Sequence, residues 1–181
     1  MKKLIFILTI IVGFNLNAQE TPEPKNELKI NMSNLIGFKW LDVSYERILN
    51  EESSIGIGTL FNLDSNSEST GLDEYRTFSI TPYYRHFFSN KYAQGFFVEA
   101  FTMLHSGKEE YYYYADFPPY NSMVSEEKYT DLAVGISIGG KFVTKRGFIA
   151  EIYLGIGRDM LGNSDIEVVG RGGVSIGYRF K

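Results

Sequence analysis

The chain contains no cysteine among its 181 residues, and this absence excludes several kinds of site. Without cysteine the protein forms no disulfide framework and no thiolate metal centre. It cannot be a lipoprotein either, because that anchor is attached to a cysteine. The glycine-rich stretches 155–157 and 170–173 lack the strand-then-helix context of a dinucleotide site. We therefore expect neither a metal ion nor a cofactor.

Positive charge is also scarce, and so are long apolar runs. Lysine and arginine number 18 against 22 acidic residues, which gives a formal net charge of −4. This balance argues against nucleic acid as a partner, because phosphate contacts need clustered basic side chains. No apolar segment reaches the roughly 20 residues that a membrane-spanning helix needs. An exported protein with this sequence that lies in a membrane must cross it as a β-barrel.

The N-terminus has the order of a secretory signal peptide. Two lysines precede an apolar run from Leu4 to Phe14, and Ala18 offers a small residue for cleavage. This order predicts a signal peptide at residues 1–18, a short periplasmic linker at residues 19–26 and one β-barrel domain at residues 27–181. An uncleaved N-terminal anchor is the alternative.

The rest of the sequence alternates apolar and polar residues with a period of two, which predicts β-strands. We expect an all-β fold, an eight-stranded antiparallel up-and-down transmembrane β-barrel. Most of the segments have at least the roughly 9–11 residues that a tilted membrane strand needs. The predicted strands are Leu28–Gly37, Lys39–Leu49, Ser54–Leu63, Glu74–Phe88, Gly95–Ser106, Lys128–Thr144, Phe148–Arg158 and Ile166–Phe180.

The connections between these strands alternate in length. Outer-membrane barrels have short periplasmic turns and longer external loops. With an even number of strands, the short connections and both termini would lie together on the periplasmic side. The short connections are 50–53, 89–94 and 145–147, and the longer, more polar ones are 64–73, 107–127 and 159–165.

Each predicted strand has one apolar face and one face of small or polar residues. Ile136, for example, alternates with Ser137, and Ile152 alternates with Glu151. The polar face has few charges, which suits a cramped interior better than a solvated surface. The alternative is a soluble periplasmic lipocalin-like barrel that binds an apolar ligand, in which Ile136, Ile152 and Ile176 would point inward.

Eight charged side chains fall on the polar face. If that face lines the lumen, these charges must be paired or hydrated, because an unpaired buried charge is costly. Four acids match four bases, which predicts an ion-paired network that plugs the barrel. A path for protons or a solute is the alternative to a structural plug. The eight residues are Asp42, Glu46, Arg85, Glu99, Lys141, Glu151, Arg171 and Arg179.

Aromatic residues make up 15% of the chain, and many fall near the predicted strand ends. Aromatic rings with a polar tip favour the membrane–water interface, so we expect these residues to form interfacial girdles. They are Trp40, Tyr45, Tyr75, Tyr83, Tyr84, Phe87, Phe88, Phe96, Tyr178 and Phe180.

Two further groups of residues offer alternative functions. His105, Ser106 and Asp131 fall near the predicted outer rim, where a His, a Ser and an acid could serve a lipid A-modifying enzyme. Adjacent strand residues point to opposite faces, however, which separates His105 from Ser106. The predicted loop 107–127 is rich in tyrosine and acidic residues, which favours contact with an extracellular partner.

Several segments resemble small outer-membrane β-barrels of unknown function, and more distantly the OmpA/OmpX type of eight-stranded barrel. In that type the last strand ends in Phe and is recognised by the outer-membrane assembly machinery, which here implies Val174–Phe180, although Lys181 follows. The resemblance implies no catalytic residue. The segments are Val43–Gly56, Thr81–Arg85, Gly95–Glu99 and Thr144–Phe148.

These patterns predict an integral outer-membrane protein with both termini in the periplasm. We expect a structural or surface-interaction role and no enzymatic activity. The expected partners are outer-membrane lipid and lipopolysaccharide, the assembly machinery and an extracellular molecule bound by the long loop.

Overall fold

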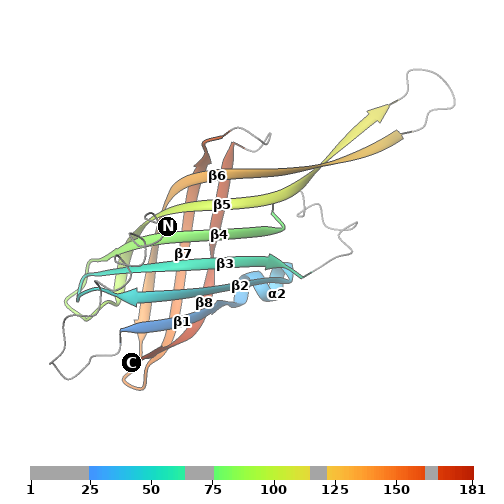
Figure 1. The fold of residues 1–181 in the computed structure, drawn as a ribbon. Coiled ribbons are helices and arrows are strands. Elements are labelled where there is room, and N and C mark those ends of the chain that lie inside the picture. Colours follow the sequence, from blue (N-terminus) through green and yellow to red (C-terminus); the bar gives the residue numbers. More distant parts are fainter. Residues whose placement is uncertain (1–24, 64–75, 115–121, 162–166) are drawn as a thin grey trace, which may run out of the picture.

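The structure is a computed structural model that describes residues 25–63, 76–114, 122–161 and 167–181, with side chains described outside 109–127. The predicted signal peptide lies outside the described residues. Eight strands form a closed barrel in which sequence neighbours pair antiparallel and β8 returns to β1 (Figure 1). The prediction of an all-β, up-and-down, eight-stranded barrel is therefore confirmed. The strands are β1 (Asn26–Asn31), β2 (Trp40–Ile48), β3 (Ser53–Asn62), β4 (Phe78–Phe87), β5 (Gly95–Tyr114), β6 (Ser122–Val143), β7 (Phe148–Asp159) and β8 (Val168–Phe180).

The first predicted strand is too long, because the chain turns into a short helix after β1. Helix α2 (Met32–Phe38) begins where the Asn34 N–H donates to Asn31 Oδ1 at 3.2 Å. Asparagine is a favoured helix N-cap for this reason. The helix ends at Lys39, whose φ of 54° is left-handed. No described helix is long and apolar enough to cross a membrane.

The predicted loop 107–127 is wrong over most of its length, since the two flanking strands continue through it. Strands β5 and β6 stay paired as far as Tyr114 and Ser122. Among the described residues, β5 pairs with β4 only as far as Ser106, and β6 pairs with β7 only from Ala133. The two form a ribbon that projects from one end of the barrel (Figure 1). Tyrosine has a high strand propensity, which accounts for the extension.

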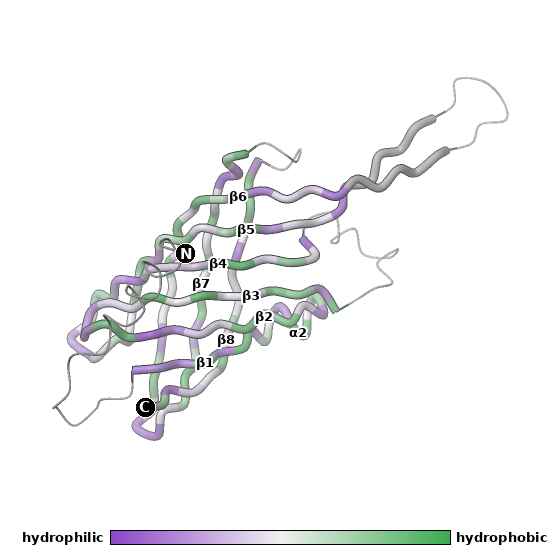
Figure 2. Tube along the Cα trace, in the orientation of Figure 1, coloured by the Kyte–Doolittle hydropathy of each residue, from purple (hydrophilic) through white to green (hydrophobic). Residues whose placement is uncertain are grey.

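The outward face of the barrel is apolar. Ile136, Ile152 and Ile176 are 60%, 63% and 47% exposed. Hydrophobic and hydrophilic positions alternate along the strands (Figure 2). The lipocalin-like alternative, which needs these isoleucines inside, is contradicted.

Aromatic rings and glycines fill the lumen together. A Cβ on Gly135 would lie 2.4 Å from Phe101 Cζ, and one on Gly139 would lie 2.5 Å from Phe97 Cζ. These glycines thus leave the space that the rings occupy. Three residues expected in the interfacial girdles, Trp40, Tyr83 and Phe87, are also buried instead. Their strand positions share the parity of the inward charges, which the girdle prediction overlooked.

Candidate functional site: the lumen network

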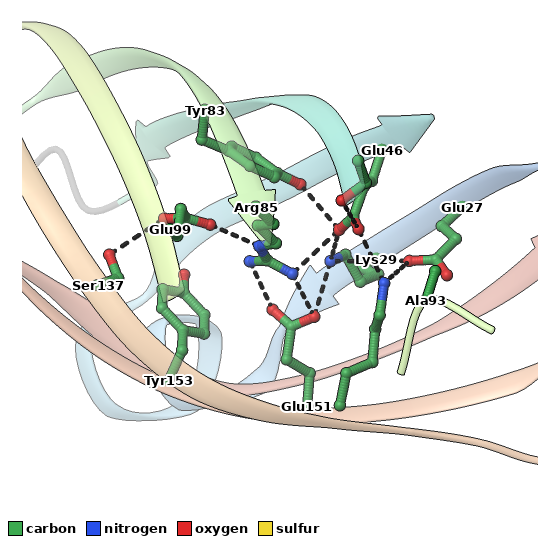
Figure 3. A network of polar contacts seen from close by, with 12 residues as sticks. Glu27, Lys29, Glu46, Tyr83, Arg85, Ala93, Glu99, Ser137, Glu151 and Tyr153 are labelled. Carbon is green, nitrogen blue, oxygen red and sulfur yellow. Dashed lines mark hydrogen bonds and ion pairs between the residues drawn. The ribbon is translucent and has the colours of Figure 1, made fainter. Parts of the chain in front are cut away.

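Arg85 on β4 lies at the centre of the charged interior. Its Nε donates to Glu99 Oε2 at 2.6 Å, and its Nη1 donates to Glu151 Oε2 at 2.6 Å and Glu46 Oε2 at 3.0 Å (Figure 3). The guanidinium also stacks over the Phe97 ring, 4.2 Å from the centroid. Arg85 therefore joins carboxylates from three other strands.

Two lysines extend this arrangement toward β1. Lys29 on β1 donates to Glu46 and to Glu151 Oε2, the latter at 2.8 Å. Lys141 on β6 donates to Glu27 Oε2 at 2.9 Å and to Glu46 Oε1 at 2.8 Å. Glu46 thus accepts from both lysines as well as from Arg85. A carboxylate has about four lone-pair sites, so such sharing is within its capacity.

Two arginines of β8 complete the set. Arg171 Nη1 donates to Glu99 Oε1 at 2.8 Å, and Arg179 Nε donates to Glu27 Oε1 at 2.8 Å. We call these nine residues the lumen network. They are Glu27, Lys29, Glu46, Arg85, Glu99, Lys141, Glu151, Arg171 and Arg179.

The structure places seven of the eight sequence-predicted residues in the lumen network. The eighth, Asp42, lies apart from it and accepts from the side-chain amides of Asn31 at 3.1 Å and Asn34 at 2.7 Å. Sequence reasoning missed Glu27 and Lys29, although both alternate with outward apolar residues. That alternation was the available signal. Glu27 lies before Leu28, where the predicted strand begins, whereas Lys29 lies inside that strand and was not included among the inward charges.

The lumen network is almost sealed from solvent. Ten of its ion pairs have N–O distances of 4.0 Å or less, and its four glutamates are 0–3% exposed. Buried charges of this kind are tolerated only when paired and hydrogen-bonded. Neutral groups complete the bonding, because Ser54 and Ser137 donate to Glu46 and Glu99. The arrangement can cross-link strands electrostatically.

The structure brings together only two of the three residues of the lipid A-modifying alternative, since His105 of β5 is paired with Asp131 of β6. His105 and Asp131 are both buried, whereas Ser106 follows His105 on the opposite face of β5. His105 Nε2 instead lies 2.8 Å from Asp159 Oδ1. Among the described residues, no three His, Asp or Glu side chains are grouped to hold a metal ion.

Comparison with known proteins bears on the fold. No protein-family model matches the chain, and no curated protein matches it. The chain is similar to the crystal structure of the N-terminal β-barrel domain of Pseudomonas aeruginosa OprF, with a TM-score of 0.58 and 12% sequence identity. The match covers 87% of this chain and 98% of that domain. A likeness at this identity supports the barrel fold.

Proposed function

We propose that this protein is an integral outer-membrane β-barrel with a structural or surface-interaction role. The observation that carries the proposal is that the barrel has a polar interior and an apolar exterior, the reverse of a soluble protein. The closed barrel buries charged side chains such as Arg85 and Glu151 inside and exposes isoleucine, leucine and phenylalanine outside. Soluble proteins rarely expose so continuous an apolar surface, because its hydration is unfavourable. Such a surface is favourable when lipid acyl chains surround it.

The proposed role is not enzymatic, and the lumen network supports a structural plug. An eight-stranded barrel has an interior that its own side chains just fill. Here each network carboxylate is held by at least one cation, so an ion entering the lumen would have to displace bonded partners. We expect negligible single-channel conductance in planar bilayers. Steady openings of the wild-type protein would favour the solute-path alternative.

Cell fractionation and gel mobility test the membrane location. The full chain, expressed in a Gram-negative host, should fractionate with the outer membrane and resist carbonate extraction. It should also migrate faster when unboiled, because a folded barrel stays compact in dodecyl sulfate. A protein that is soluble without detergent and has one mobility would contradict the proposal.

Orientation and assembly are further parts of the proposal. Both ends of the barrel chain lie at the same barrel end, since Asn26 pairs with Phe180. We place that end in the periplasm and assign Val174–Phe180 to recognition by the assembly machinery. A C-terminal tag should then be inaccessible to protease in intact cells. Deletion of Tyr178–Phe180 should reduce the folded outer-membrane fraction more than deletion of Lys181 alone.

The projecting β5–β6 ribbon is the proposed surface-interaction element. Among the described residues, β4 pairs with β5 only as far as Ser106 and β7 pairs with β6 only from Ala133, so the ribbon extends past its neighbouring strands, and a projecting strand edge is a geometry that can pair with another chain. A variant in which residues 110–126 are replaced by Asn-Gly should keep its heat-dependent mobility, because Glu109 and Glu127 are paired across the ribbon and the described residues between them pair only within it. It should lose adhesion of whole cells to surfaces or to each other. Unchanged adhesion would remove this role.

A further inference from the structure

The barrel wall contains a seam between β8 and β2, because β1 ends before these two neighbouring strands do. Strand β1 ends at Asn31, which pairs with Ser175 of β8. On either side the neighbouring strands continue, β8 as far as Val168 and β2 as far as Trp40. Helix α2 lies between them and contacts both (Figure 1). A seven-residue helix therefore takes the place of a strand in this part of the wall.

Side chains satisfy the exposed edge of β8 along this seam. The Val174 N–H donates to Ser33 Oγ at 2.9 Å, and the Gly172 carbonyl accepts from Asn31 Nδ2 at 3.0 Å. The Gly170 carbonyl accepts from Arg76 Nη2 at 3.0 Å. Individual side chains thus replace a continuous strand ladder along this edge of β8.

A cavity of about 370 Å³ lies at the seam. Its polar lining includes the inward side chains of Asp42, Arg76 and Arg171. Its apolar lining includes Phe38 and Leu154, which are 42% and 73% exposed on the outside of the barrel. The cavity thus joins the lumen to the outer surface through the wall. We call it the seam cavity.

The seam cavity holds one cation, Arg76, and one anion, Asp42, that attract each other without direct contact, and Asp42 is also attracted to Arg171. Arg76 donates to Met103 Sδ at 2.8 Å and to a main-chain carbonyl, and a thioether is a weak acceptor. Asp42 accepts from two neutral amides. Within the described part of the chain, neither residue forms a salt bridge. Arg171, by contrast, is paired with Glu99.

From this geometry we infer that the seam cavity binds a single-chain zwitterionic amphiphile. The anionic part of the headgroup takes bidentate hydrogen bonds from Arg76, which suits a phosphate. The ammonium donates to Asp42, and the acyl chain leaves through the seam past Leu154 and Phe38. The inference rests on the proposed membrane location, because that chain must continue into acyl surroundings.

The fluorescence of Trp40 can report binding in the seam cavity. It is the only tryptophan in the chain and lines the seam cavity. Lysophosphatidylethanolamine is titrated into the full-length protein in maltoside micelles while tryptophan fluorescence is recorded. A saturable change is expected, with at least tenfold weaker binding of anionic lysophosphatidylglycerol and of chain-free glycerophosphoethanolamine. Equal binding of all three, or no saturable change, would overturn the inference.

One set of variants tests the contacts with the headgroup, and a second set tests the path of the acyl chain through the seam. Asp42→Asn and Arg76→Gln should each weaken binding at least tenfold, whereas Arg158→Gln, at an exposed arginine, should not. Gly170→Leu should obstruct the seam. Gly140→Leu is its matched control, since a Cβ at either glycine meets no atom within 4 Å. The inference would be contradicted if Gly170→Leu and Gly140→Leu changed the affinity equally, or if Asp42→Asn and Arg76→Gln left it unchanged.

A second readout keeps this test independent of the membrane proposal. Heat-dependent mobility and flotation with vesicles are measured on every preparation. A protein that floats and shows the mobility shift but gives no Trp40 response removes the amphiphile site and leaves the membrane location standing. A protein that needs no detergent removes both.

Discussion

Arg179 and Glu27 join the last strand of the barrel to the first. Arg179 Nε donates to Glu27 Oε1 at 2.8 Å, although 152 residues separate the two along the chain. Strands β8 and β1 pair alongside them. The same guanidinium donates to the Ala93 carbonyl at 2.8 Å, which ties the β4–β5 connection to the closure. The barrel is therefore closed by main-chain pairing and by a buried ion pair at the same place.

This closure predicts strong coupling between the two side chains. Arg179→Met alone should destabilise the barrel by about 3–5 kcal/mol, because Glu27 keeps a buried charge with less compensation. The double variant with Glu27→Gln should cost less than the sum of the single changes, with a coupling of about 1–3 kcal/mol. Urea unfolding in micelles measures all three. The exposed pair Arg158→Met and Glu167→Gln serves as control and should be additive; additivity at Arg179 and Glu27 would contradict the prediction.

The central arginine gives a second prediction. Arg85→Met removes the cation shared by Glu46, Glu99 and Glu151 while keeping a long side chain. Unfolding free energy should fall by about 3–5 kcal/mol, since three buried carboxylates lose a partner. Arg146→Met, at an exposed turn, should change it by less than about 0.5 kcal/mol. If the two variants have similar unfolding free energies in urea, Arg85 does not stabilise the lumen network as predicted.

The period-two pattern was enough to predict the number of strands and their outward face, because a barrel strand alternates inward and outward side chains at every residue. It did not predict where β1, β5 and β6 end or begin. It could not predict which charges meet. Lys29 and Glu151 are 122 residues apart, and their contact depends on how the closed sheet staggers its strands. The helix after Asn31 was missed for a different reason. Its apolar residues extend the strand pattern, and the capping asparagine is the only local sign of a helix.

The glycines beside the lumen rings give a third prediction. A Cβ at Gly139 would lie 2.5 Å from the Ile152 carbonyl oxygen and from Phe97 Cζ. Gly139→Ala should destabilise the barrel by about 1–3 kcal/mol, because overpacking forces the ring or the backbone to move. Its neighbour Gly140 has no atom within 4 Å of an added Cβ, so Gly140→Ala should be within about 0.5 kcal/mol of wild type. Urea unfolding of both variants in one detergent makes the comparison. Equal losses would mean that strand propensity, and not the packing of Phe97, sets the cost.

If the outward face contacts lipid, a charged substitution in its middle should destabilise the barrel in a bilayer. Ile152 lies in the middle part of β7 and is 63% exposed, whereas Leu161, beyond the end of that strand, is 57% exposed. Ile152→Lys should lower the unfolding free energy in phospholipid vesicles by about 2–4 kcal/mol, because the ammonium would lie near the midplane. Leu161→Lys should cost about 0–1 kcal/mol, since its side chain reaches the interface. If water surrounded the barrel, both introduced ammonium groups would be hydrated, and the two substitutions would lower the unfolding free energy by similar amounts. Denaturant titration in vesicles distinguishes the two cases, and equal costs would contradict the assignment of this face to lipid.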